Sequence, residues 1–180
     1  MNLCLFDLDH TLLPLDSDHE FGEFLIRQGL ADAVEYRQRN DGFYQQYCNG
    51  TLVLGEYIQF TTSIWREMDV AGQQALQQAF MDEVVFPAMK PQAIELVEHH
   101  RAMGDLIAIV TATNEFVTRP IADAFNVPEL LAVKLVRDSL GRVTGDIDGV
   151  PSFREGKITR VEQWLAQQGR QLTDFERASF

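Results

Sequence analysis

Residues 3–11 read LCLFDLDHT, and this stretch decides the fold. Leu3, Leu5 and Phe6 have the character of a short strand buried in a parallel sheet, which is covered on both faces. A core strand that ends in two carboxylates must have a use for them, because burying charge costs free energy. Open α/β sheets keep their chemistry at the carboxyl ends of the strands. The stretch therefore predicts a functional site close to residue 7.

Asp7 and Asp9 can approach one ligand from the same side, since alternate side chains of a strand share a face. Two hard oxygen donors suit Mg²⁺, which takes one or two carboxylates and leaves its other positions to water and substrate phosphate. Beside such a metal, Asp7 can attack phosphorus, while Asp9 can protonate the leaving alkoxide and then activate water. We expect the Thr11 hydroxyl to fix the turn. The alternative interpretation is a cluster of turn or capping residues.

The composition is that of an ordinary soluble globular chain, with 46% hydrophobic and 23% charged residues among 180. A net charge of −12 argues against nucleic acid or an anionic membrane as partner, which leaves a small phosphorylated metabolite as the expected one. Cys4 and Cys48 form no CxxC pair, so we expect reduced thiols and a cytoplasmic protein. The early charge at Asp7 argues against a signal peptide, and no apolar run is long enough to cross a bilayer.

The middle of the chain differs from its two ends. It shows helical periodicity, and helices are predicted over residues 17–29, 31–48, 54–68 and 70–85. The sequence from Ser17 to Glu20 predicts a capping box for the first of these helices. After Pro87 the pattern alternates between helices, at 91–103, after 114 and at 155–168, and strands, at 106–110 and 130–136, with a hairpin predicted at glycines 141, 145 and 149.

This alternation predicts an α/β fold, a Rossmann-like parallel sheet between two layers of helices. Residues 1–15 and 86–180 are expected to form this core. Residues 16–85 are expected to form an all-helical cap, inserted after the first strand and covering the carboxyl edge of the sheet. In the last core helix, Ile158, Val161 and Trp164 are predicted to share the buried face.

Two further positions carry polar chemistry. Thr111 ends the second predicted strand, and its hydroxyl, together with the following backbone N–H groups from Ala112 onward, can form an anion site. The alternative is that Thr111 or Asn114 caps the next helix. Lys157 opens a helix directly after Gly156, where a lysine can bind a substrate phosphate or can lie in solvent.

Taken together, Asp7-Leu-Asp9-His-Thr11, Thr111 and Lys157 resemble the three first motifs of the haloacid dehalogenase superfamily, specifically the phosphoserine-phosphatase-like branch. The resemblance spans the whole chain. It implies that Asp7 is the nucleophile and that Asp9 is the general acid/base, whose backbone carbonyl also meets Mg²⁺. It further implies that Thr111 is a phosphate ligand and that Lys157 holds the nucleophile and the phosphate together.

The same resemblance bears on the substrate. Asp16 corresponds to the family glutamate that binds the substrate amine, although a turn residue after Pro14 is an equal alternative. A gapless count places Thr61 where the family has an arginine for the substrate carboxylate, with Arg66 as the nearest alternative. The lack of that charge-assisted contact disfavours phosphoserine and leaves room for a phosphorylated amino alcohol such as histidinol phosphate, both being amine-bearing phosphates.

The family's fourth motif, an acidic loop that completes the Mg²⁺ site, is not found before Phe180. The segment from Arg177 to Phe180 resembles the start of the strand that precedes this loop and that lies beside the first strand. We therefore expect a chain truncated before the fourth motif, with weak Mg²⁺ binding and little hydrolysis. A non-catalytic phosphate-binding relative is the alternative.

Overall fold

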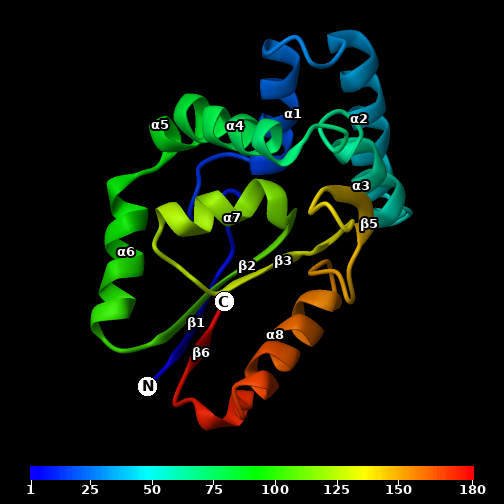
Figure 1. The fold of residues 1–180 in the computed structure, drawn as a ribbon. Helices are drawn as coiled ribbons and strands as arrows, with labels where there is room; N and C mark the ends of the chain where they lie inside the picture. Colours follow the sequence, from blue (N-terminus) through cyan, green and yellow to red (C-terminus); the bar gives the residue numbers. More distant parts are fainter.

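The computed structural model describes residues 1–180 and has a four-stranded parallel sheet at its centre, in the order β3-β2-β1-β6 (Figure 1). The strands are β1 (Leu3–Phe6), β2 (Leu106–Asn114), β3 (Leu130–Val133) and β6 (Ala178–Ser179). In the register of the sheet, Leu3 pairs with Leu106 on one side and with Ala178 on the other. The predicted α/β fold is confirmed, including a strand after Arg177 that lies beside the first one.

Alternate residues of β1 enter two different hydrophobic clusters. Leu3 and Leu5 belong to a cluster with Trp164 of α8 (Gly156–Gln167). Cys4 and Phe6 belong to the larger cluster, which includes residues of α6 (Pro91–Ala102) and α7 (Glu115–Ala124). Helices therefore cover both faces of the sheet, as Figure 1 shows, and this explains why β1 reads as a continuous apolar run.

The segment between β1 and α6 is helical and lies beyond the carboxyl ends of the strands (Figure 1). Its elements are α1 (Ser17–Arg27), α2 (Ala33–Cys48), α3 (Leu54–Thr62), α4 (Val70–Phe80), the π-helical η1 (Met81–Val85) and α5 (Phe86–Ala88). The third helix ends earlier than predicted. The Thr62 and Ser63 hydroxyls donate to the carbonyl oxygens of Ile58 and Phe60, and such bonds compete with the regular helical pattern.

Three predicted details differ from the structure. Asp16, not Ser17, caps α1, because its Oδ1 accepts from the amides of Asp18 and His19. The predicted strand 130–136 divides at Lys134, and β4 (Leu135–Arg137) leaves the sheet to form the expected hairpin with β5 (Val143–Ile147). Ile158 is 61% exposed on α8, since this first turn lies beyond the apolar contacts that bury the rest of the helix face.

The remaining element is a short 3₁₀ turn, η2 (Leu172–Asp174), which connects α8 to β6. No helix of the chain is both long and apolar enough to serve as a membrane span. Both cysteines are free, Cys4 in the core and Cys48 at the surface, as the sequence predicts.

Candidate active site

Asp7 and Lys157 meet at the carboxyl edge of the sheet although 150 positions separate them. Asp7 directly follows β1, and Lys157 lies in the first turn of α8. The Lys157 Nζ atom donates to Asp7 Oδ1 over 3.0 Å, and the two side chains are 24% and 38% exposed. A helix N-terminus disfavours a cation, because the helix dipole is positive there. The Asp7 carboxylate offsets that repulsion and holds the ammonium at the sheet edge.

Gly156 allows α8 to begin this close to the preceding loop. A Cβ atom at this position would lie 2.1 Å from the carbonyl oxygen of Pro151. Any side chain would therefore push the start of the helix away from the loop. Only glycine fits at position 156 for steric reasons, and the position of Lys157 depends on this close approach.

Asp9 is held by three donors. Its Oδ1 accepts from the Ser17 amide over 2.7 Å, and its Oδ2 accepts from the Thr113 hydroxyl over 3.0 Å and the Thr111 hydroxyl over 3.3 Å. Burial raises the pKa of Asp9, the bonds from Ser17 and Thr113 oppose the rise, and the nearby Asp16 carboxylate adds to it. A carboxyl group with a raised pKa keeps its proton at higher pH, which is what a general acid needs.

Thr113 is a residue that the sequence interpretation missed. The strand β2 continues to Asn114 rather than ending at Val110, so Thr111 and Thr113 lie on one face and both reach Asp9. The alternation of two threonines after the apolar run was the available signal. Thr111 is almost fully buried, and its hydroxyl also accepts from the Thr113 amide over 3.1 Å. Of the two capping candidates, Asn114 caps α7 through the amide of Val117.

Thr11 is exposed and does not hold the turn with its hydroxyl, contrary to expectation. The turn is closed by backbone bonds instead: the amides of Thr11 and Leu13 both donate to the Leu8 carbonyl, over 3.2 and 3.0 Å. His10 adopts a positive φ of 56° within it. The backbone alone therefore shapes this loop, and the Thr11 side chain stays free at the surface.

A cavity of about 840 Å³ opens beside Asp9 and extends beneath α1, α2 and α3. Ala112 and Thr113 line it at the sheet edge, so the cavity and the catalytic candidates share one wall. Its remaining lining is largely aromatic and acidic, includes the histidines His10 and His19, and contains no arginine or lysine. The aromatic residues are Phe43, Tyr44, Tyr47, Tyr57 and Phe153, and the acidic ones are Asp9, Asp16, Asp18, Glu20 and Asp41.

Asp16 lines this cavity but also has a structural task. Its Oδ1 accepts from the Asp18 amide over 3.1 Å and from the His19 amide over 3.0 Å, which satisfies free N–H groups at the start of α1. Asp16 therefore acts as a capping residue in the structure, in line with the turn-residue alternative. A substrate amine would have to share this carboxylate with the helix cap.

Asp18 is the second residue that the sequence interpretation missed as a site candidate. Its Oδ2 accepts from the Tyr57 hydroxyl over 2.6 Å, a contact between α1 and α3. Burial raises the pKa of Asp18 to about 7, the Tyr57 bond opposes the rise, and the Asp16 and Asp9 carboxylates increase it further. Burial and the Asp18 charge together raise the pKa of Tyr57 well above 10, so this phenol remains a donor.

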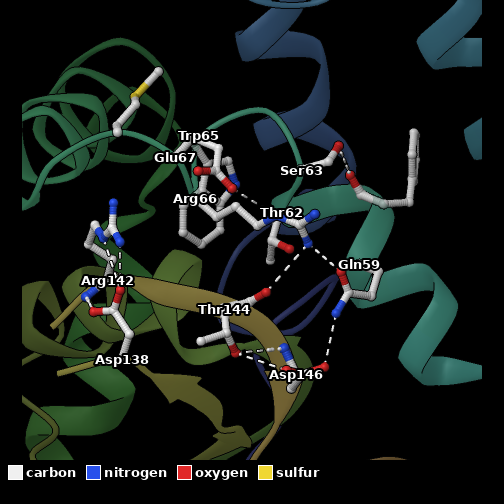
Figure 2. A network of polar contacts seen from close by, with 12 residues as sticks. Gln59, Thr62, Ser63, Trp65, Arg66, Glu67, Asp138, Arg142, Thr144 and Asp146 are labelled. Atoms are coloured by element: carbon white, nitrogen blue, oxygen red, sulfur yellow. Dashed lines mark hydrogen bonds and ion pairs between the residues drawn. The ribbon is translucent and has the colours of Figure 1, made fainter. Parts of the chain in front are cut away.

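The candidate carboxylate clamp lies outside the cavity. Figure 2 shows Arg66 directed toward β5, where its guanidinium donates to Gln59 Oε1 and to the Thr144 carbonyl, while Gln59 in turn donates to Asp146. Thr61 is buried, and its hydroxyl donates to the Ile58 carbonyl within α3. Neither residue lines the cavity, so no guanidinium is available there for a substrate carboxylate.

The donors at the sheet edge fit a magnesium ion. Asp7 Oδ1 accepts from Lys157, and Asp7 Oδ2 has no hydrogen-bond partner, which leaves a carboxylate oxygen for a cation. Nowhere in the chain do three or more His, Cys, Asp or Glu side chains converge on a possible metal position. A site built on one carboxylate oxygen would leave the other positions of Mg²⁺ to water and substrate phosphate, which this ion accepts as ligands.

Comparisons with known proteins agree with the observed fold. The family model described as haloacid dehalogenase-like hydrolase matches residues 4–178. A histidinol-phosphatase from Neisseria meningitidis serogroup C is 36% identical over 179 residues, which are 99% of this chain and 81% of that protein.

Solved structures show the same fold. A protein of unknown function from Bordetella pertussis Tohama I is 47% identical with a TM-score of 0.90, over 98% of this chain and 79% of that one. A phosphoserine phosphatase with bound substrate has a TM-score of 0.64 at 16% identity, over 98% of this chain and 76% of that one. At 16% identity, the similarity to the phosphoserine phosphatase concerns the fold alone.

Proposed function

The chain belongs to the haloacid dehalogenase-like hydrolase family, and from this premise we propose that it is a Mg²⁺-dependent phosphatase that hydrolyses a small phosphomonoester through an aspartyl-phosphate. One observation carries the proposal. Asp7, Asp9 and Lys157, with Thr111 and Thr113, come from three distant segments and lie at one sheet edge, next to a cavity. This arrangement provides a nucleophile, a proton donor and a cation for the same phosphate.

The contacts at the sheet edge support the following proposed reaction. An Asp7 carboxylate oxygen attacks phosphorus, and the bond from phosphorus to the leaving oxygen breaks. Asp9 gives its proton to this leaving alkoxide, for which its raised pKa is suited. Asp9 then takes a proton from water, which attacks the phosphorus of the aspartyl-phosphate and regenerates the Asp7 carboxylate. Lys157 donates to Asp7 in the free protein and neutralises phosphate charge during transfer.

Asp7 and the Asp9 backbone carbonyl would hold the Mg²⁺ ion, which supplies positive charge to the phosphoryl oxygens. We assign the Thr111 hydroxyl and the Ala112 amide to phosphate binding, with the Thr11 side chain at the outer rim of the turn. The Thr111 hydroxyl donates to Asp9 in the free protein, so phosphate would compete with Asp9 for this donor.

Residues 16–85 act in this proposal as a cap that selects the substrate. The cavity beneath these helices has acidic and aromatic walls and no arginine or lysine. A substrate carboxylate would find no cationic partner there, which disfavours phosphoserine. An amine-bearing phosphate such as histidinol phosphate suits these walls, and the histidinol-phosphatase at 36% identity supports that choice. Asp16 is one candidate receptor for the amine.

The test is hydrolysis of p-nitrophenyl phosphate with and without Mg²⁺, with Asp7→Asn as the matched control. We expect release of p-nitrophenol that increases with Mg²⁺ into the millimolar range, and none above background from Asp7→Asn. Release of p-nitrophenol that depends neither on Mg²⁺ nor on Asp7 would contradict the proposal. Binding of phosphate with no turnover under any condition would instead favour a non-catalytic relative.

A further inference from the structure

The cavity beside Asp9 is lined by five acidic residues and two histidines, His10 and His19, and by no arginine or lysine. Asp18 lies in its wall, and the charged groups that shift its pKa, Asp16 and Asp9, are also carboxylates. Its one hydrogen bond in the structure comes from Tyr57, a neutral phenol. Lys157, the cation of the sheet edge, is paired with Asp7 and does not line the cavity. A ligand that carries positive charge therefore suits this cavity.

Asp16 is less suited than Asp18 to meet this positive charge. One Asp16 oxygen is already bound to two amides at the start of α1. Asp16 Oδ2 and Asp18 Oδ1 each accept no hydrogen bond, but the amides bonded to Asp16 lie at the positive end of the helix dipole, whereas Asp18 is bonded only to the neutral phenol of Tyr57. The bond to Tyr57 fixes the carboxylate in place between α1 and α3, so a cation would meet an already oriented acceptor.

Aromatic rings lie next to this acceptor. Phe43 packs edge-on against Tyr57 with 5.4 Å between ring centroids, and Tyr47 approaches Phe153 at 6.1 Å. All four rings line the cavity. Aromatic faces attract organic cations and bury flat rings. Together with Asp18, they form a wall that suits an ammonium group attached to a flat heterocycle.

We propose that Asp18, oriented by Tyr57, determines specificity by binding the positively charged group of the phosphate substrate, with the aromatic wall packed against the rest of that substrate. The inference rests on the proposed function, because it takes the ligand to be a phosphomonoester seated at Asp7. It assigns the main cation contact to Asp18 rather than to Asp16. It also explains why a phenol whose pKa is strongly raised faces a carboxylate in the cavity: the phenol holds that carboxylate in place.

The experiment measures Kd by calorimetry without Mg²⁺, so that the proposed Mg²⁺-dependent hydrolysis does not consume the ligand, for two probes, histidinol phosphate and glycerol phosphate, which share the phosphate but differ in charge. The unmodified protein is expected to bind histidinol phosphate at least about tenfold more tightly, as one charge-assisted contact allows. Asp18→Asn keeps the size and the Tyr57 bond and is expected to remove most of this preference. Asp18→Ser removes the charge with a smaller side chain and is expected to give the same result.

Two controls locate the effect. Asp82→Asn makes the same chemical change on an exposed helix surface outside the cavity and should keep the preference within about twofold. Asp16→Asn retains a capping residue and should change the preference less than Asp18→Asn does. A preference that survives in both Asp18 variants, or one that only Asp16→Asn removes, overturns the inference.

The two proposals fail in different ways. If the protein hydrolyses p-nitrophenyl phosphate but binds both probes equally, the inference about Asp18 is wrong and the proposed function stands. If it prefers histidinol phosphate through Asp18 but hydrolyses no phosphomonoester, the binding inference stands and the proposed reaction is wrong. If it neither binds nor hydrolyses a phosphomonoester, both are wrong.

Discussion

The sheet edge and the cavity differ in how their charged side chains are paired. At the edge, Asp7 is paired with Lys157 before any substrate arrives, and Asp9 is bonded to two hydroxyls and an amide. In the cavity, Asp18 has only a phenol as partner and other carboxylates nearby. The edge can therefore serve any phosphate, while the cavity gains a partner only from a cationic substrate. This difference separates the reaction from the choice of substrate.

Asp9→Asn should have the largest effect and should act on the edge alone. Loss of the proton donor is expected to lower kcat/KM for histidinol phosphate, which reports the first phosphoryl transfer and not the later hydrolysis that also uses Asp9, by about 10²- to 10⁴-fold. The loss should be smaller for p-nitrophenyl phosphate, because p-nitrophenolate is a good leaving group that needs no proton. Steady-state kinetics with both substrates measure this. Equal losses would show that Asp9 does not act as the acid toward the leaving group.

Asp18→Asn should stabilise the protein at high pH, which sharpens the contrast with the paired charges of the edge. Burial raises the pKa of Asp18 to about 7, whereas the unfolded chain releases this proton at an ordinary, lower pH. The contribution of Asp18 to the free energy of unfolding is thus fully present at low pH and is lost as the pH rises toward 7. At pH 8 we expect Asp18→Asn to raise the free energy of unfolding by about 1–3 kcal/mol, with no gain at pH 4.

Urea denaturation at the two pH values, with Asp82→Asn as control, measures this difference. A variant that is less stable than the unmodified protein at pH 8 would mean that the Asp18 charge supports the fold. The cavity would then resemble the edge in having its charges balanced by the protein itself.

Arg66→Ala should have the smallest effect on the substrate. Its guanidinium is bonded to Gln59 and to the Thr144 carbonyl, so the variant should lose about 1 kcal/mol of unfolding free energy. Kd for phosphoserine and for histidinol phosphate should each change by less than about twofold. Both probes are expected to bind in the cavity, which Arg66 does not line. A weakening confined to phosphoserine would place a carboxylate clamp in the cavity after all.

The edge was predictable because the backbone alone determines it. The carboxyl ends of parallel strands meet at one edge, so an apolar run followed by Asp7 and Asp9, and another followed by Thr111, must come together. Thr113 follows from the same alternation once β2 is known to extend to Asn114. The Thr11 hydroxyl was not predictable, since backbone bonds already close that turn.

The cavity was not predictable from the pattern of the sequence. Helical periodicity shows which face of a helix is apolar, but not how α1 and α3 are rotated against each other. Asp18 and Tyr57 are 39 positions apart, and each reads as an ordinary helix residue. For the same reason, a gapless count could not tell whether Thr61 or Arg66 faces the substrate, and the structure directs neither of them there. The substrate-selecting residues emerge only from the packing of the helices.

The central claim is that phosphate passes through Asp7 at the sheet edge. It is tested most directly by rapid acid quench of the protein during turnover with Mg²⁺, followed by mass spectrometry of the peptide that contains residues 1–27. We expect a phosphate adduct on Asp7 that hydroxylamine removes and that Asp7→Asn lacks. An adduct on any other residue, or turnover by Asp7→Asn at the unmodified rate, would contradict it.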